Sequence, residues 1–135
     1  MGLAEKRAVK EFVDQSWPHF KSAIIAAAGF EPAIEVNWDQ LAAPEYSHLY
    51  KEAFPKVYFE PVVAAFKGIC SDEMGRDALK AALKKIEFFN TESFSNSNGF
   101  TFEGGTLRYD HKPCTNIDDV EDRTKGLVKL LESKL

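Results

Sequence analysis

The chain has 135 residues, a length that suits one domain able to bury its own core. Hydrophobic residues make up 44% and aromatic residues 13%, including 11 phenylalanines, which indicates a globular protein rather than a disordered one. The formal net charge is −4 and is spread evenly, so no basic region predicts nucleic-acid binding. No apolar run reaches the roughly 18 residues of a membrane helix. We therefore expect residues 1–135 to form one domain, with no nucleic-acid or membrane partner.

The N-terminus does not have the basic-then-apolar order of a signal peptide. The two cysteines, Cys70 and Cys114, fall in different predicted elements, and we interpret both as reduced thiols. These two observations predict a cytoplasmic protein.

The first 69 residues predict helices around one short strand. Apolar residues at steps of three and four indicate a helix over 3–28. Pro18 interrupts this helix near Trp17, Ser16 can cap a new helix there, and Gly29 closes it. Strict alternation then predicts a half-buried strand. The further elements expected here are a strand over 33–38, with Asp39 capping the next helix, a helix over 44–54 that Pro55 ends, and a helix over 58–69 with Pro61 in its first turn.

The remaining residues predict a helix, three strands and a last helix. Ser71 can cap a helix over 72–84, which Gly75 weakens slightly. The paired glycines after Glu103 indicate a tight hairpin turn, because glycine readily takes the positive φ that such turns need. Asp118 with Glu121 fits a capping box, and leucines recur at helical steps behind it. The strands are expected over 86–90, 99–103 and 106–111, with a polar and mobile loop over 91–98.

These elements predict an α+β fold. We expect a three-stranded antiparallel meander with the strand over 33–38 at one edge, packed against four to five helices. The phenylalanines of strand 99–103 and the leucines of the C-terminal helix should meet in the core.

His111 and Cys114 form the first candidate site, since a thiol beside an imidazole can act as a nucleophile with its base. A spacing of three residues across Pro113 does not establish contact, and cysteine is often an inert buried residue. The prediction is accordingly that neither residue is catalytic.

Asp118, Asp119, Glu121 and Asp122 form the second candidate, because clustered carboxylates can bind Mg²⁺ or Ca²⁺. Their spacing does not match an EF-hand loop, and acidic residues at a helix start already stabilise the helix dipole. We expect no metal and no cofactor.

The third candidate is aromatic. Tyr46, His48, Tyr50 and Tyr58 lie in or near the predicted helices over 44–54 and 58–69. Tyrosines are common both in cores and at interfaces, because they bury a large area and keep a polar group. These four residues are the predicted partner- or ligand-binding residues.

The favoured hypothesis is a non-catalytic protein-interaction domain, with a homodimer as one form of it. It is immunity- or inhibitor-like only by analogy of size and charge. The alternatives are a small-molecule binder with an aromatic pocket between residues 46–58 and the sheet, and a Cys/His hydrolase.

Overall fold

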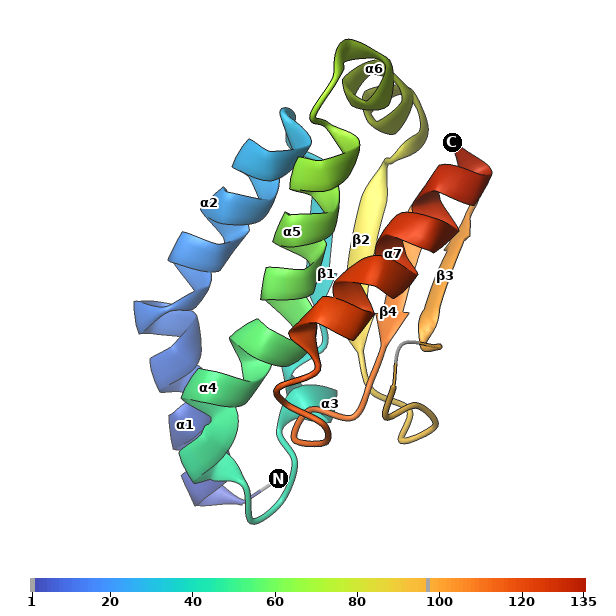
Figure 1. Cartoon of the computed structure of the whole chain (residues 1–135). Coiled ribbons are helices and arrows are strands. Elements are labelled where there is room, and N and C mark those ends of the chain that lie inside the picture. Colours follow the sequence, from blue (N-terminus) through green and yellow to red (C-terminus); the bar gives the residue numbers. More distant parts are fainter. Residues whose placement is uncertain (1, 97) are drawn as a thin grey trace.

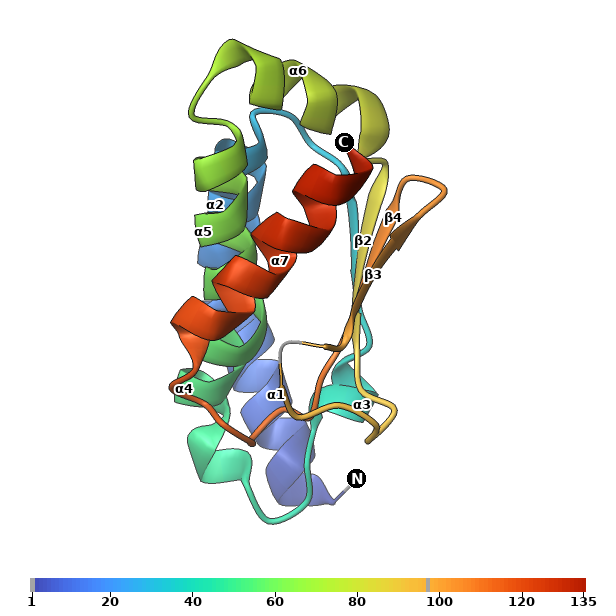
Figure 2. The same ribbon diagram turned by 45° about the vertical axis from the view of Figure 1, so that its right-hand side comes forward.

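The structure is a computed structural model that describes residues 2–96 and 98–135. Ser97, in the loop expected over 91–98, lies outside the described residues. A four-stranded sheet carries its helices on one face, as Figures 1 and 2 show, which confirms the α+β fold. The strands are β1 (Ala33–Val36), β2 (Lys85–Phe89), β3 (Phe100–Glu103) and β4 (Thr106–Asp110). The helices are α1 (Leu3–Gln15), α2 (Trp17–Ala28), α3 (Trp38–Leu41), α4 (Tyr50–Phe54), α5 (Glu60–Ile69), α6 (Glu73–Ala82) and α7 (Val120–Lys134), with a 3-10 turn at Ser47–Leu49 and a π-helical turn at Pro55–Phe59.

The strands do not pair as the predicted meander. Their order is β1-β2-β4-β3, with β1 and β4 both parallel to β2 and only β3 and β4 antiparallel. The sheet is therefore mixed, although β1 does lie at an edge as expected. The meander was wrong because the connection over 90–99 is long enough to carry the chain past one strand position. β4 then returns into that position, and its Leu107 and Tyr109 become fully buried.

Local signals account for most element ends. The break in the first helix falls at Ser16, and Gly29 ends α2 with a φ of 83°. Gly104 and Gly105 form the hairpin turn with φ of 59° and 82°, the positive values that a type I′ turn requires. These predictions are confirmed, except that the Ser16 side chain makes no capping hydrogen bond.

Several predicted caps and ends were wrong. Asn37 rather than Asp39 caps α3, by accepting a hydrogen bond from the Gln40 N–H. Asp72 rather than Ser71 caps α6, because its carboxylate accepts from the Gly75 N–H at 2.7 Å. Pro55 does not end the helix before it. The chain continues from Pro55 through the π-helical turn into α5, where the Glu60 N–H donates to the Pro55 carbonyl oxygen.

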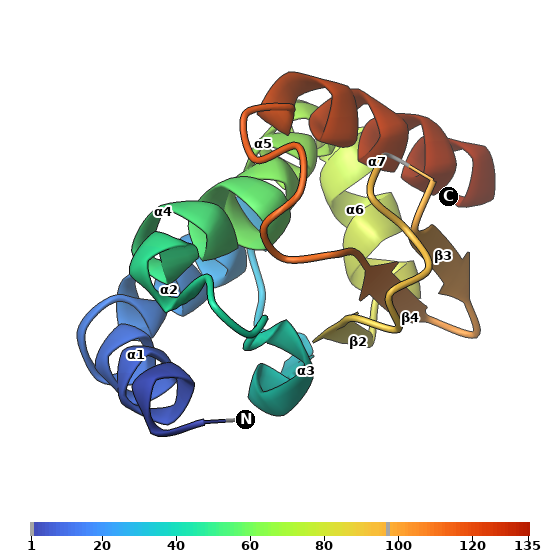
Figure 3. The ribbon, with the colours of Figure 1, turned by 90° about the horizontal axis from the view of Figure 1, so that it is seen from below.

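The core lies between the sheet and the helices that cover it. α7 crosses β3 and β4 on the covered face (Figure 2), and its Leu127 and Leu131 are fully buried. Phe100 and Phe102 belong to the same buried cluster, so the predicted meeting of strand and helix is confirmed. Figure 3, viewed from below, shows the helices gathered on one side of the strands. On the opposite face, Glu87 pairs with both Lys85 and Arg108.

Candidate functional site

His111 lies in the core directly after β4 and has no exposed surface. Its Nδ1 is 2.6 Å from the Lys112 carbonyl oxygen, which can only accept, so Nδ1 carries the proton. Its Nε2 then accepts a hydrogen bond from Nε of Arg123 at 3.1 Å. Burial lowers the pKa of His111 to about 4; the hydrogen bond to Lys112 opposes this shift, and the Arg123 charge adds to it. Both ring nitrogens of this neutral imidazole are therefore occupied.

Cys114 follows three residues later and is half-buried. Burial raises the pKa of its thiol to about 11, so the thiol stays protonated at neutral pH. A thiol nucleophile needs the opposite shift and a base with a free nitrogen. His111 and Cys114 thus provide neither half of an activated pair.

Arg123 is a buried charged residue that the sequence analysis did not single out. It is 1% exposed, and its guanidinium donates to the carbonyl oxygens of Thr115, Asn116 and Ile117 as well as to His111. These contacts hold the loop between β4 and α7. The helical spacing in the sequence could have indicated its burial. Arg123 lies four and eight residues before the buried Leu127 and Leu131, which puts all three on one face of α7.

The acidic group at the start of α7 does not converge. In the described part of the chain, no three His, Cys, Asp or Glu side chains are placed to hold a metal ion. Asp118 instead pairs with Lys56 at 3.0 Å, and Asp119 takes the N-cap position without a side-chain capping bond. The predicted capping box of Asp118 with Glu121 was therefore wrong, since α7 begins one residue later than that motif needs.

The four predicted binding residues divide between surface and core. Tyr46 is 48% exposed and His48 is also exposed. Tyr50 is 1% exposed, and its hydroxyl donates to the Ala43 carbonyl oxygen at 2.6 Å. Tyr58 is fully buried, and its hydroxyl donates to the His111 carbonyl oxygen. Tyr46 and His48 are thus on the surface, whereas Tyr50 and Tyr58 both belong to the core.

One alternative was an aromatic pocket between residues 46–58 and the sheet. At Tyr58 and the neighbouring Phe59, aromatic rings fill the space toward the sheet. Phe59 meets Phe88 of β2 edge-on with ring centroids 5.1 Å apart. Tyr58 meets Tyr109 of β4 in the same way at 5.5 Å. These ring contacts pack Tyr58 and Phe59 directly against β2 and β4.

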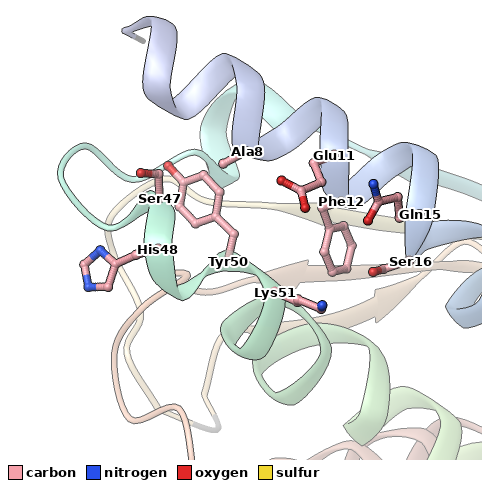
Figure 4. Close-up of a pocket in the computed structure, with 9 residues that line it drawn as sticks. All are labelled: Ala8, Glu11, Phe12, Gln15, Ser16, Ser47, His48, Tyr50 and Lys51. Atoms are coloured by element: carbon pink, nitrogen blue, oxygen red, sulfur yellow. The ribbon is translucent and has the colours of Figure 1, made fainter.

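A cavity of about 240 Å³ lies instead between α1 and residues 47–51, and we call it the α1 pocket (Figure 4). The buried rings of Phe12 and Tyr50 form its floor. Glu11 points from α1 into the gap, Lys51 lies on the opposite wall, and His48 points away. Its other lining residues are Ala8, Gln15, Ser16 and Ser47. The α1 pocket therefore joins an aromatic floor to a rim carrying one carboxylate and one ammonium group.

No family model, no curated protein and no solved structure matches this chain. Among the described helices, none is both long and apolar enough to cross a membrane.

Proposed function

We propose that the protein is a non-catalytic protein-interaction domain, and that it binds its partner with the surface formed by Tyr46, His48 and the α1 pocket. The observation that carries this proposal is the pocket itself. An aromatic floor next to an exposed tyrosine is the kind of site that takes an anchoring side chain from a protein partner.

The size of the α1 pocket favours a partner side chain over a small molecule. Pockets for drug-sized ligands span about 300–1,000 Å³, and most of the ligand is buried in them. At about 240 Å³ the α1 pocket is smaller than this range. The neutral His111 and the protonated Cys114 support the same choice over a Cys/His hydrolase. We place the interaction in the cytoplasm, where thiols such as Cys70 and Cys114 stay reduced.

Affinity capture from the native host, with quantitative mass spectrometry, tests the proposal. The baits are the wild-type protein, the double variant Tyr46→Ala/His48→Ala and the control Met74→Ala. Met74 is 83% exposed and lies on α6, away from the α1 pocket. Both variants change only exposed side chains and should remain folded.

The expected result is a partner that wild type and the control capture equally and that the double variant loses by about tenfold or more. That partner could be a second copy of the chain, and light scattering on the purified protein detects that case. Capture of every protein equally by all three baits contradicts the proposal.

A further inference from the structure

We infer that the α1 pocket takes a basic side chain, an arginine or a lysine of the partner. This inference rests on the proposed function and names the chemistry of the group that enters the pocket. In this arrangement the aliphatic part of the partner's side chain packs on Phe12 and Tyr50, and its cationic end lies at Glu11.

The Glu11 carboxylate supplies the first argument. Within residues 2–96 and 98–135, Glu11 makes no ion pair, although Lys10 and Asp14 beside it on α1 pair with each other at 2.7 Å. Glu11 points into the gap rather than along the helix surface (Figure 4). Its charge is thus available to an incoming cation, and a charge-assisted hydrogen bond to a carboxylate is about twice as strong as a neutral one.

A second carboxylate of α1, that of Glu5, lies outside the lining of the pocket but acts on Tyr50. Glu5 accepts a hydrogen bond from the Glu45 N–H at 3.3 Å, which ties the start of α1 to the loop before Tyr46. Burial raises the pKa of Tyr50 to about 12, and the charge of Glu5 adds to this shift, so Glu5 acts electrostatically on the pocket floor. The charge of Glu5 therefore adds to that of Glu11 in favouring a cation over an anion near Tyr50.

The floor suits the same occupant. Arginine and lysine lay their methylene stems on apolar surface while the charged end stays with polar groups. The faces of aromatic rings also attract cations that come within about 6 Å of the centroid. A purely apolar side chain would use Phe12 and Tyr50 but would gain nothing from the Glu11 carboxylate at the rim.

The test measures binding of three blocked amino acids by ¹⁵N NMR titration. The probes are N-acetyl-arginine amide, N-acetyl-leucine amide and N-acetyl-glutamate amide, and the reporters are the backbone amides of Ala8, Phe12, Ser47 and Tyr50. We expect saturable shifts with the arginine probe and weaker binding of the other two.

Three charge variants sharpen this test. Glu11→Gln should weaken binding of the arginine probe about tenfold, because the carboxylate is lost. Lys51→Gln should tighten it by about two- to threefold, because a like charge is removed. Glu31→Gln, the matched control on an exposed residue between α2 and β1, should leave the affinity unchanged.

The inference is overturned if the arginine probe gives no saturable shifts, if the glutamate probe binds more tightly, or if Lys51→Gln weakens binding of the arginine probe. The protein-interaction proposal is decided separately, by whether Tyr46→Ala/His48→Ala loses a captured partner. One outcome separates the two proposals: Tyr46→Ala/His48→Ala loses the partner, but Glu11→Gln captures it as well as wild type does. That outcome supports the protein-interaction function and rejects a basic side chain in the pocket.

Discussion

At the scale of single residues, Arg123 and His111 form a buried polar pair that holds the loop between β4 and α7. The guanidinium has neutral partners, the imidazole and three carbonyl oxygens, so its charge is compensated by dipoles. Such a cluster is stable only while every donor and acceptor is satisfied. His111 accepts from Arg123 only as a neutral ring, which makes the pair sensitive to pH.

We predict that the free energy of unfolding falls by about 2 kcal/mol when the pH is lowered from 7 to 5, because of His111. Its pKa is about 4 in the folded protein, below the 6.5 of a free imidazole. The unfolded chain therefore binds the proton first, so this contribution to stability is complete above about pH 6.5 and is lost as the pH falls toward 4. Urea unfolding at several pH values measures it.

His111→Gln is the control for this prediction. The variant should be less stable at pH 7 yet lose most of the pH dependence between 7 and 5. Equal slopes in the variant and the wild type would show that other groups are responsible.

At the scale of elements, two helical glycines have opposite surroundings. A Cβ at Gly75 of α6 would overlap the carbonyl oxygen of Ile69, whereas a Cβ at Gly68 of α5 would meet open space. The sequence suggested only that Gly75 weakens α6. In the structure, Gly75 allows α6 to begin very close to the end of α5.

Gly75→Ala and Gly68→Ala should therefore change stability in opposite directions. Alanine is favoured over glycine by about 0.8–1 kcal/mol in a helix interior, so Gly68→Ala should stabilise by up to that amount. Gly75→Ala should destabilise by about 1–3 kcal/mol, because the backbone of Ile69 must move. Thermal unfolding of both variants tests the pair, and a stabilised Gly75→Ala would disprove the close approach.

At the scale of the whole molecule, the two faces of the sheet have different environments. Phe102 of β3 points into the core under α7 and is 6% exposed, while Thr101 beside it is exposed on the bare face. β1, β2 and β4 are parallel to one another, and parallel strands are commonly covered on both faces. Here an ion-paired surface of Glu87 with Lys85 and Arg108 takes the place of the second helix layer.

This one-sided burial predicts a large difference between neighbouring substitutions. Phe102→Ala should lower the free energy of unfolding by roughly 3–5 kcal/mol. Thr101→Ala should change it by at most about 1 kcal/mol, because its side chain loses little burial. Chemical denaturation of both variants measures the two values, and comparable losses would mean that the face of Thr101 is also covered.

Part of the candidate site was also within reach of sequence reasoning. Of the residues predicted to bind a partner or ligand, His48 and Tyr50 line the α1 pocket, and their role in binding stays a prediction. The α1 wall with Glu11 and Phe12 was not foreseen, because nothing in the chain between α1 and residue 47 indicates that these segments meet. Tyr58 could not be assigned to the core by its type, since tyrosine is common in both environments.

The amino-acid sequence alone determined the fold class, the break at Ser16, the Gly104–Gly105 hairpin and the core face of α7. Each of these depends on residues within a few positions of one another, through periodicity, capping or turn geometry. Only the tertiary structure decided that β4 enters between β2 and β3, that Arg123 binds the carbonyl oxygens of the loop before α7, and that α1 forms a pocket with residues 47–51. Those outcomes depend on contacts between distant segments, and a connection as long as residues 90–99 leaves several strand pairings sterically open.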